Sequence, residues 1–176
     1  ANNGNIYCTA PVDAQKPGKL YLVKPGGEKV VVDEGLKFPN GLTLSPDQTQ
    51  LYVTESATHW VWVYQIKQDG MLTAKQRYGW LHVAENDDNS WADGLRCDTA
   101  GRIYTTTNLG IQIFDQMGRV NAILPLPAGN ASNCVFGGRN LDVLYVTAGS
   151  HVYRRKLKTR GVQPFEKPIK PMPPKM

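Results

Sequence analysis

Three weakly similar copies of one sequence unit run through the chain, and this repetition limits the possible folds more than any other feature. The clearest copy, residues 38–56, reads FPNGLTLSPDQTQLYVTES. The copies align on three apolar pairs: Leu51-Tyr52, Ile103-Tyr104 and Leu144-Tyr145. About eleven positions upstream of each pair stands a polar residue: Asn40, Asp93 and Asn133. Each copy therefore combines a polar residue, a short apolar strand, a turn and a second strand, as one unit of a repeat protein does.

The segments between the turns are short and rich in β-favouring residues. No stretch shows apolar residues at helical spacing over the length of a helix, whereas runs of about five residues, such as 103–107 and 120–124, end near Gly, Pro or Asp. Such strands, in units of roughly forty residues, predict an all-β chain built as a β-propeller of four-stranded antiparallel blades. A β-sandwich also has short strands, but it gives no reason for a polar residue to recur at one place.

The repeat units predict about three to four blades, an incomplete set for a closed ring. Complete units begin at three residues: Asn40, Asp93 and Asn133. The N-terminal unit lacks its first strand, and since the chain opens at Ala1 inside that unit, we expect further sequence upstream. We expect the partial propeller to span residues 1–165, and the Pro- and Lys-rich residues 166–176 to form an extended tail.

Propeller geometry predicts that the three polar residues lie together. Because the first strand of each blade lies beside the central channel, Asn40, Asp93 and Asn133 should meet at one mouth of that channel. Loops between second and third strands open on the same side, which places His59 there, and Trp91 stands two residues before Asp93. Amide and carboxylate oxygens without a cluster of Cys or His suit a hard cation such as Ca²⁺. On geometry alone, the alternative remains that Asn-Gly and Asp-Gly only form turns at the strand entries.

Composition argues against several other classes of protein. With 20 Lys and Arg against 15 Asp and Glu the net charge is +5, but the basic residues are scattered and lack interleaved aromatic residues, so we expect no nucleic-acid binding. No run is long enough to cross a bilayer, so we expect a soluble protein that does not bind membranes. Cys8, Cys97 and Cys134 lack the spacing of a metal or redox motif and are expected to be free thiols, mostly buried.

Three segments resemble successive blades of one known family. They read FPNGLTLSPDQTQLYVTES, WADGLRCDTAGRIYTTTNLGIQIFDQMGRV and ASNCVFGGRNLDVLYVTAGSHVYRRKL. They resemble the senescence-marker-protein/gluconolactonase (regucalcin-like) family, especially its bacterial gluconolactonases, over nearly the whole chain up to about Gly161. The resemblance implies a six-bladed propeller with one divalent cation on its axis, usually Ca²⁺ with Zn²⁺ or Mg²⁺ as alternatives. It also implies hydrolysis of a small sugar lactone or related ester, and leaves bacterial cytoplasm and periplasm open as compartments.

The resemblance also implies roles for single residues. Asn40 of the PNGL motif and Asp93 of the DGL motif match metal ligands of the family, and Asp93 is also the candidate for activating the attacking water. By the repeat geometry, three further residues are expected to line the channel or touch substrate: Asn133, Trp91 and His59. The alternative for Trp91 is structural packing, and the alternative for His59 is a merely solvated loop histidine. A third family ligand, a glutamate of the first blade, is not in this chain. We therefore expect the C-terminal part of a longer lactonase, or copies that assemble into a ring; the alternative is a non-catalytic propeller fragment that binds a partner or itself.

Overall fold

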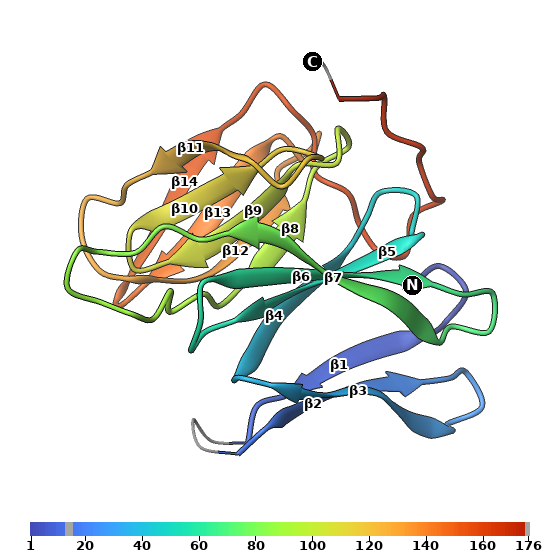
Figure 1. Ribbon diagram of the computed structural model, residues 1–176. Coiled ribbons are helices and arrows are strands. Elements are labelled where there is room, and N and C mark those ends of the chain that lie inside the picture. Colours follow the sequence, from blue (N-terminus) through green and yellow to red (C-terminus); the bar gives the residue numbers. More distant parts are fainter. Residues whose placement is uncertain (13–15, 175–176) are drawn as a thin grey trace.

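The described part of the chain folds into β-strands. The computed structural model (Figure 1) describes residues 1–12 and 16–174, and these contain fourteen strands in four antiparallel sheets and no helix. The predicted all-β class is confirmed. Among the same residues there is accordingly no apolar helix of the length that a bilayer requires.

Each sheet is formed by strands that follow one another in the chain. The first sheet comprises β1 (Ile6–Ala10), β2 (Gly18–Val23) and β3 (Lys29–Leu36). The second comprises β4 (Pro39–Leu44), β5 (Gln50–Glu55), β6 (Trp60–Ile66) and β7 (Leu72–Trp80). The third comprises β8 (Leu95–Cys97), β9 (Ile103–Thr107), β10 (Gly110–Phe114) and β11 (Val120–Leu124). The fourth comprises β12 (Ala131–Gly137), β13 (Val143–Ala148) and β14 (His151–Lys156). Sequence neighbours pair within every sheet, so each consists of successive hairpins.

Strand pairing is irregular where the repeated polar residues lie. The register between β4 and β5 shifts between Pro39 and Leu42, and the register between β12 and β13 shifts just before Asn133. Asn133 is therefore the third residue of its strand and not, as the sequence predicts, the residue before it. Asp93 precedes β8, whose pairing begins only at Leu95. Where the pairing is irregular, a side chain no longer follows the regular alternation between the two faces of a sheet. It can then point past the end of the strand.

Apolar side chains fill the spaces between successive sheets. In β5, Leu51 and Val53 belong to the core between the first and second sheets, whereas Tyr52 points to the other face and joins the core between the second and third. The same alternation places Ile103 in the second core and Tyr104 in the third, which lies between the third and fourth sheets. Since side chains alternate along a strand, both faces of the inner strands of the two middle sheets are buried. This explains why β5 and β9 are almost entirely buried along their lengths.

The first strands of the sheets lie side by side. β1 contacts β4, β4 contacts β8, and β8 contacts β12. From β4 onward, the first strand of each repeat is thus the element through which consecutive repeats meet, whereas β1, which the sequence predicts to be the second strand of its repeat, lies against β4.

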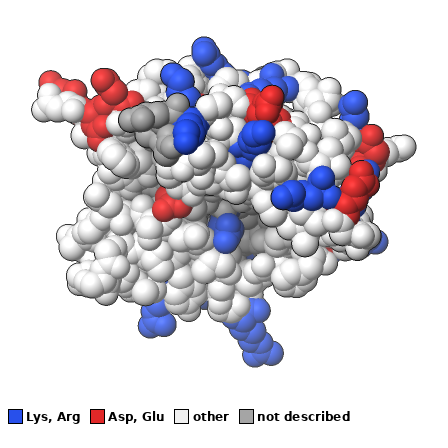
Figure 2. All heavy atoms as spheres, turned by 90° about the horizontal axis from the view of Figure 1, so that it is seen from below, with Lys and Arg blue, Asp and Glu red and all other residues white. Residues whose placement is uncertain are grey.

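The outer faces of the first and fourth sheets carry exposed apolar side chains. On β1 and β3, Ile6 and Val31 point away from the first core; on β12 and β14, Val135 and Val152 point away from the third. Their exposed fractions range from 40% for Val31 to 68% for Val152. Charged side chains of both signs are interspersed on the face that Figure 2 shows, with no continuous basic patch.

The residues after β14 run along the turns of the second and third sheets (Figure 1). Gly161 forms a bridge with Asp98, and the backbone N–H of Ile169 donates to the carbonyl oxygen of Pro46 at 2.8 Å. Further along, Gln116 Nε2 donates to the carbonyl oxygen of Met172 at 2.7 Å. This part of the segment that the sequence predicts as an extended tail is held against the two sheets.

Candidate active site

A glycine after Asn40 and another after Asp93 bring the first strands of successive repeats into close contact. A Cβ atom on Gly41 would lie 2.0 Å from the carbonyl oxygen of Asp93, and one on Gly94 would lie 2.3 Å from Oδ1 of Asn133. Only a residue without a side chain allows this approach. The Asn-Gly and Asp-Gly pairs thus serve as contacts between repeats, a role that the sequence analysis, which offers turn formation only as the alternative to metal binding, misses.

Asn40 and Asp93 meet in one pocket. Its volume is about 270 Å³, and it is lined by Phe38, Asn40, Ser56, Ala57, Asn89, Trp91 and Asp93. Asn40 comes from the start of β4 and Asp93 from the residues before β8, so two different repeats supply the polar side chains. Of the site residues that the sequence predicts, the pocket brings together Asn40, Asp93 and Trp91.

Ser56 connects the two sides of the pocket. Its Oγ donates to the carbonyl oxygen of Ala92 at 2.5 Å and accepts a hydrogen bond from Nδ2 of Asn40 at 3.2 Å. The Asn40 amide is thereby oriented through its nitrogen. Its oxygen can then accept a hydrogen bond from a ligand or coordinate a cation. Ser56 ends the predicted repeat motif, but its contacts depend on residues 36 positions away and could not be found from spacing alone.

The Asp93 carboxylate is half-buried without a cationic partner among the described ion pairs. Partial burial desolvates the carboxylate and raises its pKa, while a hydrogen bond from the side chain of Asn40 opposes this effect without cancelling it. A carboxylate of this kind can accept a proton or bind a cation. No group of three or more His, Cys, Asp or Glu side chains surrounds a possible metal position in residues 1–12 and 16–174.

The other two predicted site residues lie outside this pocket. Asn133 packs against Gly94 and lines a separate cavity of about 290 Å³, where its Oδ1 accepts the backbone N–H of Cys134. The ring of His59 stacks on Trp80 with a centroid distance of 4.3 Å, and its Nδ1 lies 3.2 Å from the carbonyl oxygen of Leu81. Both residues therefore make structural contacts here.

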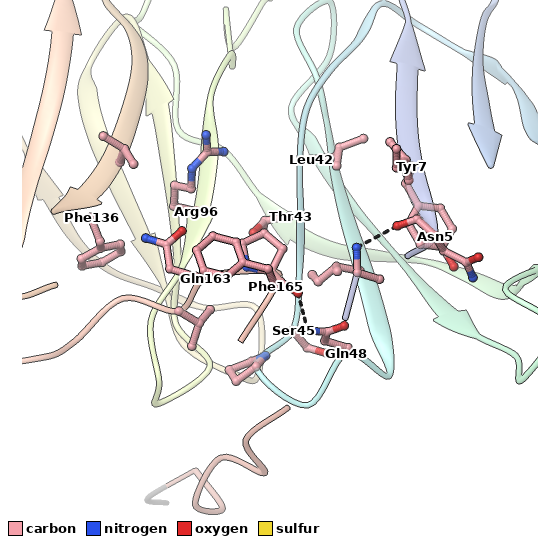
Figure 3. Close-up of a pocket in the computed structure, with 17 residues that line it drawn as sticks. Asn5, Tyr7, Leu42, Thr43, Ser45, Gln48, Arg96, Phe136, Gln163 and Phe165 are labelled. Carbon is pink, nitrogen blue, oxygen red and sulfur yellow. Dashed lines mark hydrogen bonds between the residues drawn. The ribbon is translucent and has the colours of Figure 1, made fainter. Parts of the chain in front are cut away.

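A larger cavity lies at the opposite end of β4. Figure 3 shows this cavity of about 450 Å³, between Leu42, Thr43 and Ser45 on one side and Arg96 and Phe136 on the other, with Gln163 and Phe165 of the C-terminal segment across it. None of the described residues that line it carries a carboxylate, a thiol or an imidazole. Despite its size, it therefore lacks the carboxylate or imidazole that commonly serves as a general base.

The structure belongs to the class of all-β proteins built from repeated antiparallel sheets that pack face to face and meet at their first strands. An amide and a carboxylate lie at the beginnings of two of these strands. The chain belongs to the SMP-30/gluconolactonase/LRE-like family, whose sequence model matches residues 1–150.

The three cysteines, Cys8, Cys97 and Cys134, are free thiols, and the last two are buried, as the sequence predicts.

The relatives identify this family as one of lactonase-like enzymes. The chain is 32% identical to a gluconolactonase of Zymomonas mobilis over 147 residues, which cover 81% of this chain and 41% of that protein. It is 28% identical to the pentonolactonase XacC of Haloferax volcanii over 82% of this chain and 49% of the relative. A solved gluconolactonase structure from Xanthomonas campestris superposes with a TM-score of 0.73 at 26% identity, over 89% of this chain and 55% of that one. The chain thus spans about half the length of the relatives that it matches.

Proposed function

We propose that the whole protein hydrolyses a sugar lactone or a related ester at the pocket that holds Asn40 and Asp93. The observation that carries this proposal is the meeting of an amide and a carboxylate, from two different repeats, in one small pocket. It is supported by relatives that are named gluconolactonase and pentonolactonase.

Asp93 is the residue to which we assign the proton transfer. As the oxygen of a water molecule attacks the lactone carbonyl carbon, the Asp93 carboxylate takes one of its protons. The bond between that carbon and the ring oxygen then breaks, and the ring oxygen receives a proton to give the open hydroxy acid. Desolvation raises the pKa of Asp93, which makes it a better proton acceptor than an exposed aspartate.

The donor set of the pocket fits part of a divalent-cation site, with Ca²⁺ the first candidate and Zn²⁺ or Mg²⁺ as alternatives. An amide oxygen and an unpaired carboxylate are donors that Ca²⁺ prefers, but Ca²⁺ takes about six to eight oxygen ligands. Asn40 and Asp93 would therefore hold it only together with further oxygens. When bound, such a cation polarises the lactone carbonyl.

The proposal also assigns the four sheets to part of a six-bladed propeller. The contacts between the first strands support this arrangement, because the innermost strands of neighbouring blades adjoin in such a ring. The apolar outer faces of the first and fourth sheets would then contact further blades. The same exposed faces favour a second candidate function, in which the chain is a non-catalytic module that associates with a partner or with itself.

Hydrolysis of glucono-1,5-lactone by the whole protein, followed by acid release, tests the proposal. We expect Asp93→Ala to lower the rate by on the order of 100-fold or more, as loss of a general base does. Asp88→Ala removes an exposed carboxylate of the preceding loop and is the matched control. Chelation should abolish the activity, and Ca²⁺, Zn²⁺ or Mg²⁺ should be compared for its recovery. If Asp93→Ala keeps the full rate, the assignment of the base is wrong.

A further inference from the structure

We propose that Phe38 and Trp91, here called the aromatic pair, contact the ring of the substrate and favour binding of cyclic lactones over open-chain esters. This inference rests on the proposed function and names the substrate class of the same pocket. Trp91 is expected from the sequence to line the site, whereas Phe38 is identified only by the structure.

The aromatic pair occupies equivalent positions in two repeats. Phe38 stands two residues before Asn40, and Trp91 stands two residues before Asp93. Both have a left-handed backbone, with φ angles of 56° and 51°. This conformation is uncommon for large side chains, is energetically unfavourable, and is concentrated at ligand-binding sites. The third repeat has Ala131 at the equivalent position, with no left-handed backbone. The unusual conformation thus accompanies the two polar residues that share the pocket.

The backbone of Ser56 fixes the two aromatic residues relative to each other. Its N–H donates to the carbonyl oxygen of Phe38 at 3.0 Å, and its carbonyl oxygen accepts the backbone N–H of Trp91 at 3.1 Å. A single residue therefore bridges both members of the pair. The backbone positions of the two aromatic residues are therefore set by the protein before a ligand arrives, which reduces the entropy that binding must overcome.

The indole of Trp91 is held in place although it is exposed. Its exposed fraction is 57%, yet Nε1 donates to Oδ2 of Asp87 at 2.6 Å. The same Asp87 oxygen accepts a hydrogen bond from Nδ2 of Asn108 at 3.2 Å, so the acid is itself anchored. The indole nitrogen is thus satisfied at its edge, and the apolar face of the ring is available for contact.

An exposed, fixed aromatic ring suits a ligand with a flat apolar face. The ring of a sugar lactone presents C–H bonds on its faces and hydroxyl groups at its edge, whereas an open-chain ester has no such face. The pocket volume of about 270 Å³ is below that of typical drug-sized sites and suits a single small ring. The aromatic pair would then contact the ring while Asn40 and Asp93 face the reacting carbonyl.

Kinetics of the whole protein on glucono-1,5-lactone and on the open-chain ester 4-nitrophenyl acetate test this inference. We expect Trp91→Ala and Phe38→Ala each to raise KM for the lactone about 3- to 10-fold, the range that aromatic contacts support. The value of kcat should stay within about twofold, and hydrolysis of the ester should not change. Trp91→Phe should restore most of the affinity. Trp80→Ala removes another exposed indole, which lies outside the pocket, and should leave KM unchanged.

A purely structural role would give a different pattern. Trp91→Ala would then lower kcat for both substrates, and Trp91→Phe would not restore KM.

Binding of the corresponding 1,5-lactam, measured by calorimetry, separates this inference from the proposed function. If the wild type hydrolyses no lactone but binds the lactam, and Trp91→Ala weakens that binding, the pair is supported while the function fails. Equal lactam binding by the wild type and Trp91→Ala, or no binding by either, overturns the inference.

Discussion

Replacement of Gly41 by alanine tests the contact between the repeats that forms the pocket. The added Cβ would lie 2.0 Å from the carbonyl oxygen of Asp93 and 3.0 Å from both the carbonyl carbon of Asp93 and the backbone nitrogen of Leu95, whereas ordinary contacts begin at 3.4 Å. All three atoms belong to the backbone, so no side-chain rotation relieves the clash. The strands β4 and β8 must separate, and overpacking of this kind costs about 1–3 kcal/mol.

Gly26→Ala is the matched control for this change. A Cβ at Gly26 meets no atom within 4 Å, and its φ does not lie in the left-handed region. Both variants restrict the unfolded chain equally, which by itself stabilises the fold by about 0.4–1 kcal/mol. The difference between them therefore isolates the clash at Asp93.

Thermal and urea unfolding, followed by far-UV circular dichroism, measure that difference. Gly41→Ala should unfold several degrees below Gly26→Ala, since each kcal/mol shifts the midpoint by about 2–4 °C in a chain of this size. In the whole protein, kcat/KM of the proposed lactone hydrolysis should fall as well, because separation of the strands moves Asn40 away from Asp93. If the two variants differ by less than about 0.5 kcal/mol in the free energy of unfolding, the strands do not approach as closely as described.

Two further predictions concern the loop before Asp93 and the outer face of the fourth sheet. Gln112 is fully buried and bonds both the N–H and the carbonyl oxygen of His82, so Gln112→Ala should cost about 1–3 kcal/mol in urea unfolding, whereas Gln65→Ala on an exposed position should cost little. If the outer faces drive association, Val152→Lys should reduce the mass seen by size-exclusion chromatography with light scattering. An unchanged mass, or a wild type that is already monomeric, would exclude association through this face.

The repeat made most of the fold predictable from the sequence. Local turn residues and strand propensities placed the strands at 103–107 and 120–124 where the structure has them. β12 starts three residues earlier than the expected start at Cys134, because a register irregularity lets pairing resume at Ala131 beyond Asn133. Such an irregularity depends on the partner strand and leaves no mark in local sequence.

The candidate site was predictable only in part. Asn40 and Asp93 are recognisable because each repeat presents a polar residue at the same place. Phe38 and Ser56 were missed, since a left-handed φ and a backbone bridge between distant residues have no spacing rule. The repeated glycine was visible at Gly41, but its meaning was not, because a turn and a close approach between strands favour the same residue.

The C-terminal segment determines how this molecule could be attached to a solid support. Residues 161–172 lie against the turns that follow β4 and β10. The hydrogen bonds from Ile169 to Pro46 and from Gln116 to Met172 show this. The pocket with Asn40 lies at the other end of β4. A tether joined beyond Met172 would therefore leave from the far side, and the molecule would sit on a resin or electrode with its pocket facing the flowing solution.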